Sequence, residues 1–256
     1  MTDASTATPD TSHTTRGPRV WKFWGTLLWG ILVFAAMGIG QIAVVAYFVW
    51  TQQTPMDAAA MIAMLGNGRT IALSVIAGLP GVLLVLWIAT RLARISLADY
   101  LALRSFSWKF LLIGIVALAV LSQGWDWVAH GVGHEVSPGF MGEVLKTARA
   151  ENSLWLLVLS FCAAAPLTEE LMTRGFLYRG WWESFLRPFG AIILSTVVWT
   201  CMHLQYDAFF LAQVFSIGLL FGYLRYRSNS TWLTIILHGL NNLAATLQTM
   251  YLLSNG

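Results

Sequence analysis

The stretch Thr168-Glu169-Glu170-Leu171-Met172-Thr173-Arg174-Gly175 follows directly on an apolar run, Ser153–Leu167, and places two carboxylates and a guanidinium at its end. A charged side chain at the middle of a bilayer costs about 2.5–3.5 kcal/mol, so charges in such a run usually serve a function. On a helix, Glu170 and Arg174 lie four residues apart on one face and can pair. Glu169 lies about 100° away around the helix, so this pair need not engage it.

The composition is that of a membrane protein. Of the 256 residues, 57% are hydrophobic and 11% are charged, and the mean hydropathy is +0.66, which excludes an ordinary soluble domain. The net charge of +3 is small and no stripe of Lys and Arg is present, so we expect no nucleic-acid partner. Cys162 and Cys201 lie in apolar runs and are expected to be buried free thiols.

We predict an all-α polytopic membrane protein with about seven transmembrane helices of roughly 20 residues or more. The fourth is expected to run past Arg174 as one continuous helix. Two short helices are expected between spans, one at 54–65 and an amphipathic one starting at Ser137-Pro138. The expected spans are residues 24–50, 70–89, 110–129, 153–182, 189–203, 208–224 and 232–253.

Three regions follow from this division. Residues 1–20 are expected to form a disordered N-terminal tail, because Thr, Ser, Pro and Asp dominate them. Residues 21–149 hold the first helices and their interfacial segments, and residues 150–253 hold the candidate catalytic core. Basic residues cluster before the first span and between spans 2 and 3, 4 and 5, and 6 and 7. By the positive-inside rule, this predicts a multi-pass protein of the cell membrane with a cytoplasmic N-terminus.

The spacing of Glu169 and His203 predicts that the two residues lie at the same depth in the membrane. The turn between spans 4 and 5 is expected near 184–188, and the midpoint of 169 and 203 falls inside it. Because both arms of an antiparallel helix hairpin rise about 1.5 Å per residue, the two side chains should meet. His238 and Asn242 lie four residues apart on one face of the last span, roughly 10–17 Å from its cytoplasmic end.

These residue types indicate hydrolysis. The carboxylate of Glu169 and the imidazole of His203 can hold and deprotonate a water molecule, while His238 and Asn242 can donate to a developing oxyanion. Alternatively, Glu169, His203 and His238 could be three ligands of an open zinc site. The residue types alone do not separate these mechanisms, so a divalent metal is left open as a cofactor.

Each of these polar groups also has a structural interpretation. Asn242 could join two helices by a hydrogen bond, as polar residues often do in membrane bundles. Glu170 and Arg174 are expected to form a structural ion pair rather than to act in the chemistry. A second histidine pair, in His130-Gly131-Val132-Gly133-His134-Glu135, is expected in a loop and lacks the Glu placement of a zincin. Asp126, near the end of the third span, is expected at the membrane interface.

Three motifs in order resemble those of the CPBP intramembrane proteases, which carry the Abi domain. That family includes the CAAX prenyl endopeptidases of type 2 and lysostaphin-resistance-like proteins, and some members process bacteriocins or confer immunity. The motif EExxxR matches Glu169 to Arg174, FxxxH matches Trp199 to His203, and HxxxN matches His238 to Asn242. The resemblance covers residues 150–250 and departs from the family pattern where Trp199 replaces Phe.

The resemblance implies a conical catalytic bundle of C-terminal helices. It implies Glu169 as general base, His203 as its partner in activating water, and His238 and Asn242 as an oxyanion or site-shaping pair. Glu170 and Arg174 take the place of a supporting ion pair, and Trp199 is expected to line the site. Family members are often labelled metalloproteases, although a glutamate–histidine mechanism without metal has also been argued.

The expected function is therefore an intramembrane endopeptidase that acts on a membrane-associated peptide or protein, with the lipid bilayer as its surroundings and an active site near the cytoplasmic side. The alternative is a non-catalytic immunity or scaffold protein of the same fold. A proton-coupled carrier is less favoured because the sequence contains no internal repeat. The sequence defines neither the oligomeric state nor whether the substrate is prenylated.

Overall fold

The computed structural model describes residues 17–52, 55–134 and 139–255. Most of the expected N-terminal tail and the expected helix start at Ser137-Pro138 lie outside these residues. The described chain contains helices and no strand. In chain order the helices are α1 (Phe23–Thr51), α2 (Ala58–Leu65), α3 (Gly68–Ala93), α4 (Leu97–Tyr100), α5 (Trp108–Val132), α6 (Gly139–Ala150), α7 (Leu154–Leu159), η1 (Ser160–Ala164), α8 (Ala165–Glu170), η2 (Leu171–Leu177), α9 (Tyr178–Trp182), α10 (Arg187–Cys201), α11 (Ala208–Ser228) and α12 (Thr231–Asn255).

The expected all-α polytopic membrane fold is confirmed, but the expected number of seven spans is not. Among the described residues, five helical segments are long and apolar enough to cross a membrane: α1, α3, α5, the continuous segment Leu154–Trp182, and α11. The apolar helix α10 has 15 residues, or roughly 22 Å, which is less than the roughly 30 Å of a hydrocarbon core. The helix α12 has 25 residues but is interrupted by His238, Asn241, Asn242 and Gln248, which lower its hydropathy.

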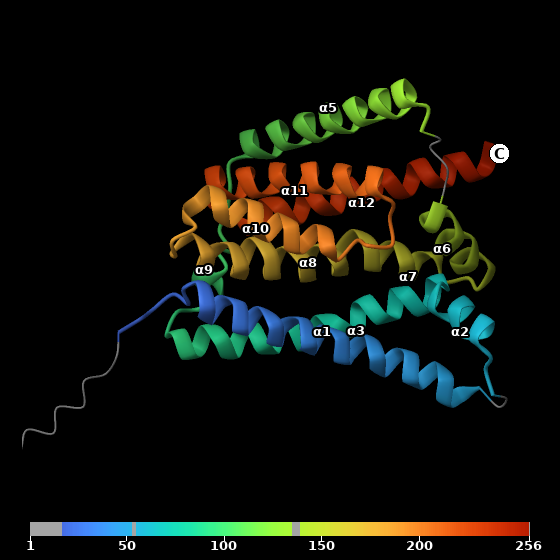
Figure 1. The fold of residues 1–256 in the computed structure, drawn as a ribbon, viewed down its shortest axis with the longest axis horizontal. Coiled ribbons are helices and arrows are strands. Elements are labelled where there is room, and N and C mark those ends of the chain that lie inside the picture. Colours follow the sequence, from blue (N-terminus) through green and yellow to red (C-terminus); the bar gives the residue numbers. More distant parts are fainter. Residues whose placement is uncertain (1–16, 53–54, 135–138, 256) are drawn as a thin grey trace, which may run out of the picture.

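The long helices alternate in direction along one axis (Figure 1). In that view α1, α5, α10 and α12 run one way and α3, the segment α7 to α9, and α11 run the other. The helices α1 and α3 form an antiparallel pair on one side, α5 lies on the opposite side, and the segment α7 to α9 lies between them with α10, α11 and α12. The end at which α1 and α12 begin also holds most of the arginines that flank the helices.

The segment Leu154–Trp182 is one continuous helix, as the sequence predicts, but it contains two π-helical stretches. The stretches η1 and η2 lie directly before and after α8, the helical turn that carries Glu169 and Glu170. A π-helical stretch inserts extra residues into the i→i−4 ladder and often marks a functional site. Here the two stretches set the rotation of α8 relative to the rest of the span.

The helices α1 and α3 approach each other at glycines. A Cβ atom on Gly40 would lie 2.2 Å from the carbonyl oxygen of Ala77 and 3.0 Å from the Cα of Gly78. These neighbours are backbone atoms, which cannot rotate away, so only glycine allows this contact. Small residues that permit close backbone approach are typical of helix pairs in membranes.

The cysteines differ from the prediction of two buried thiols. Both are free, but Cys162 is half-buried and Cys201 is exposed at the last residue of α10. Apolar surroundings in a membrane sequence indicate either packing or lipid contact, and the pattern alone does not separate the two.

We expect Gly40→Ala to lower the free energy of unfolding by about 1–3 kcal/mol, because the added methyl group forces α1 away from α3. Thermal unfolding of the purified chain in one detergent, followed by tryptophan fluorescence, measures the effect. Gly38→Ala is the matched control on the same helix, because nothing lies within 4 Å of its Cβ position. An equal response of the two variants would show that the contact at Gly40 is unimportant.

Candidate active site

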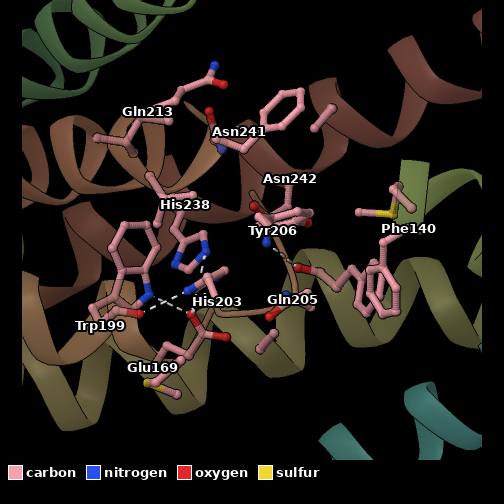
Figure 2. A pocket seen from close by; sticks show the side chains of 18 of the residues that line it. Phe140, Glu169, Trp199, His203, Gln205, Tyr206, Gln213, His238, Asn241 and Asn242 are labelled. Atoms are coloured by element: carbon pink, nitrogen blue, oxygen red, sulfur yellow. Dashed lines mark hydrogen bonds and ion pairs between the residues drawn. The ribbon is translucent and has the colours of Figure 1, made fainter. Parts of the chain in front are cut away.

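Glu169 is the centre of the candidate site. It projects from α8, and its Oε2 accepts a hydrogen bond of 2.6 Å from the indole Nε1–H of Trp199 on α10. The same oxygen lies 4.0 Å from Nε2 of His203 and 3.9 Å from Nε2 of His238 (Figure 2). One carboxylate oxygen therefore faces an indole and two imidazoles from different parts of the bundle, as the equal depth of Glu169 and His203 predicts.

His203 lies outside the helix in which the sequence places it. The helix α10 ends at Cys201, and His203 belongs to the turn between α10 and α11. The backbone N–H of His203 donates to the carbonyl of Thr200 at 2.9 Å, and its ring Nδ1 lies 2.9 Å from the carbonyl oxygen of Trp199. A carbonyl can only accept, so Nδ1 carries the proton and Nε2 is left as an acceptor toward Glu169.

Glu170 and Arg174 form the buried ion pair that the sequence predicts. Nη1 of Arg174 donates to Oε1 of Glu170 at 2.9 Å, and both side chains are fully buried. The guanidinium also donates from Nη2 to the carbonyl oxygen of Gly218 at 3.1 Å, and its Cζ lies 4.5 Å from the centre of the Trp199 ring. A Cβ on Gly218 would meet this guanidinium group and the Trp199 ring, so α11 can supply that carbonyl only through a glycine.

His238 connects this pair to Glu169. Its Nδ1 lies 3.1 Å from Oε1 of Glu170, the oxygen that also accepts from Arg174. Because a carboxylate paired with Arg is an acceptor, Nδ1 of His238 donates and Nε2 points toward Glu169. The ring is almost fully buried and lies edge-on to Trp199 at 5.3 Å.

Asn242 has a structural contact as well as a place in the site. Its Nδ2 donates to the carbonyl oxygen of Phe161 in the π-helical stretch η1 at 2.9 Å. One turn earlier on α12, a Cβ on Gly239 would lie 2.5 Å from the carbonyl oxygen of Cys162. The close approach at Gly239 and the hydrogen bond from Asn242 hold α12 against η1, while the second amide N–H of Asn242 stays free of this contact.

The three candidate metal ligands are less closely placed than a zinc ion requires. With bonds of about 2.0–2.1 Å, two ligands of a tetrahedral zinc lie about 3.4 Å apart, whereas Oε2 of Glu169 is 4.0 and 3.9 Å from the two imidazole nitrogens. The same oxygen accepts from Trp199, an indole that cannot bind a metal. Within the described residues, no group of three or more His, Cys, Asp or Glu side chains is placed to hold a metal ion.

The second histidine pair lies away from Glu169. His130 belongs to the last turn of α5 rather than to a loop, and His134 follows the end of that helix, with Nε2 3.6 Å from Oδ2 of Asp207 and its ring stacked on Phe209 at 4.3 Å. Glu135 lies outside the described residues. These contacts give His134 a role in packing α5 against the start of α11.

The candidate residues line a large cavity of about 1190 Å³. Glu169, Trp199, His203, His238 and Asn242 all contribute to its wall, and it extends to residues of α1, α3, α5, α6 and α11. Pockets for small molecules typically hold about 300–1,000 Å³, so this cavity is large enough for a longer ligand such as a peptide segment.

Two contributors to the site have no counterpart in the sequence prediction. The carbonyl of Phe161 was not identifiable because the π-helical stretch that presents it leaves no clear pattern in the sequence. Tyr206 lines the cavity, and its ring lies parallel to His203 at 6.2 Å. The position of Tyr206, three residues after His203, is the sequence feature that could have identified it as part of the site.

Comparison with known proteins gives one family. Residues 151–244 match the family model described as type II CAAX prenyl endopeptidase, Rce1-like. No curated protein matches the chain, and no solved structure matches it. The match spans a little over a third of the chain, and it includes Glu169, Trp199, His203, His238 and Asn242. The matched segment 151–244 carries the whole candidate site, and the match agrees with the resemblance of the three motifs to CAAX-type intramembrane proteases.

Proposed function

We propose that this protein is an intramembrane endopeptidase that hydrolyses a peptide bond of a membrane-associated protein or peptide, with water activated by Glu169 and His203. One observation carries the proposal: Oε2 of Glu169 lies 4.0 Å from Nε2 of His203 and 3.9 Å from Nε2 of His238. All three residues line one cavity between membrane helices. The match to an endopeptidase family supports it. The clustered arginines support placing the end at which α1 begins in the cytoplasm.

Hydrogen bonding in the site favours a water molecule between Glu169 and His203. Both facing atoms are acceptors, and at 4.0 Å they are too far apart for a direct hydrogen bond, which suits a bridging molecule that donates to both. The water gives one proton to Glu169 while its oxygen attacks the carbonyl carbon of the substrate. The protonated Glu169 then delivers that proton to the leaving amine nitrogen, which breaks the peptide bond and restores the carboxylate.

His238 and Asn242 are placed to stabilise the charge that develops in the reaction. Nδ1 of His238 lies 3.1 Å from Oε1 of Glu170, and this contact holds the imidazole beside Glu169. When Nε2 of His238 also carries a proton, the ring donates from Nδ1 to Glu170 and from Nε2 into the cavity. Together with the second N–H of Asn242, it can stabilise the oxyanion of the tetrahedral intermediate.

We expect Glu169→Gln and His203→Ala to lower kcat/KM by about 10²–10⁴-fold, because each removes a group that positions or deprotonates water. The assay uses the full chain in lipid nanodiscs and a set of internally quenched peptides with one apolar membrane segment. Glu143→Gln, on the exposed surface of α6, is the matched control and should leave cleavage unchanged. Cleavage that persists in both site variants would support the alternative of a non-catalytic scaffold or immunity protein.

Removal of divalent metals tests the choice of mechanism. We expect cleavage to continue at the same rate after treatment with EDTA and with 1,10-phenanthroline, because the proposed chemistry uses only protein groups and water. Metal analysis of the active preparation should give less than one zinc per chain. A loss of activity that added zinc restores would instead assign Glu169, His203 and His238 to a metal site.

We expect Arg174→Met to destabilise the chain by about 3–5 kcal/mol, because it leaves the carboxylate of Glu170 buried without its cation. Denaturant unfolding in mixed micelles measures the loss. The double variant Glu170→Gln with Arg174→Met should regain most of it, since it removes both charges. If Arg174→Met unfolds at the same denaturant concentration as the parent chain, the pair is not a structural requirement.

A further inference from the structure

The cavity extends well beyond the candidate catalytic residues. On one side it reaches α5, where Ser122, Trp125 and Asp126 line it. Figure 2 shows Gln213 and Asn241 on the far side of His238 from Glu169, so this part of the cavity is polar. A peptide whose scissile bond lies at Glu169 would extend into this region.

The acidic side chains of the described cavity wall have no basic counterpart among lysines and arginines. In the part of the chain that the structure describes, three carboxylates line the cavity, Asp126, Glu169 and Asp207, and no Lys or Arg does. Arg174 lies behind Trp199 and is fully buried, so it does not face the cavity. A cavity lined by charge of one sign attracts ligand groups of the opposite sign.

Two of these carboxylates already have partners. Oε2 of Glu169 accepts from Trp199 and faces the two imidazoles. Asp207 caps α11 by accepting from the backbone N–H of Phe210 at 2.9 Å, and it lies 3.6 Å from His134. Asp126 makes no hydrogen bond or ion pair with any other described residue, so its charge is available to a ligand.

Asp126 is held in place by its neighbour. The indole Nε1–H of Trp125 donates to Oγ of Ser216 on α11 at 2.8 Å, and the Trp125 ring lies edge-on to Phe209 at 5.2 Å. These contacts fix this turn of α5 against α11. The position of the carboxylate at the cavity wall is therefore set by packing.

We propose that Asp126 binds a Lys or Arg side chain of the substrate, so that the enzyme selects peptides with a basic residue flanking their apolar segment. Asp126 lies six residues before the end of α5, about 9 Å along the helix, which suits a residue at the boundary of a membrane segment. The side chains of Lys and Arg place their charge at such a boundary while their stems stay in apolar surroundings. This inference rests on the proposed endopeptidase function.

The test compares three peptides that share one apolar segment and carry Lys, Gln or Glu at the same flanking position. Cleavage is measured with the full chain in nanodiscs of phosphatidylcholine, whose neutral headgroups remove charge effects of the bilayer. We expect kcat/KM to be highest for the Lys peptide. The ratio of Lys to Glu cleavage should fall roughly fivefold in Asp126→Asn, the size of effect typical of a partly exposed ion pair, and reverse in Asp126→Lys.

Two controls keep the outcomes separate. Asp99→Asn removes an exposed carboxylate of α4 outside the cavity and should leave the ratio as it is in the parent chain. Binding of the same peptides to the Glu169→Gln chain, measured without cleavage, should show the same order and weaken as salt rises. Cleavage of all three peptides at equal rates, or an unchanged ratio in Asp126→Lys, would overturn the inference and leave the proposed function standing. A parent chain that binds the Lys peptide more tightly but cleaves none of the three would contradict only the proposed function.

Discussion

The fully buried pair of Glu170 and Arg174 is the interaction on which the rest of the site depends. A buried carboxylate and guanidinium are costly to remove from water, and only complete pairing and hydrogen bonding compensate that cost. Arg174 meets this demand by reaching the carbonyl of Gly218 on α11 and the face of the Trp199 ring on α10. Glu170 meets it by accepting from His238 on α12. The pair thereby fixes three helices around the span that carries it.

Glu169 gains its position from its neighbour in sequence. Adjacent residues on a helix point about 100° apart, so when Glu170 turns into the packed interior, Glu169 turns toward the cavity. The two π-helical stretches that flank α8 set this rotation, and η1 also presents the carbonyl that holds Asn242. One acid thus supports the structure and the next is left exposed to the cavity, which explains why the two carboxylates of the motif take different roles in the proposed mechanism.

Sequence reasoning succeeded where a single physical rule decides the outcome. The i,i+4 spacing of Glu170 and Arg174 predicts their pairing, and the symmetry of a helix hairpin predicts that Glu169 and His203 approach. It failed where local backbone geometry decides, as in the end of α10 before His203 and in the π-helical stretches, because no residue pattern marks either one. The direct hydrogen bond from Trp199 to Glu169 was also not predictable, because an aromatic residue in an apolar run usually indicates a packing role.

The count of spans shows how the site itself limits what hydropathy can predict. The helix α12 is long enough to cross a bilayer, yet its hydropathy is too low for it to be recognised as a membrane span, because it carries the His and Asn residues of the cavity. The helix α10 is apolar enough but ends after 15 residues, and the turn that follows carries His203 to Glu169. Irregular or polar backbone at membrane depth is tolerated where it lines a cavity inside the protein. Of the two helices that depart most from an ideal span, α12 therefore carries His238 and α10 leads into the turn that carries His203, and the departure is a direct consequence of placing polar chemistry inside a membrane bundle.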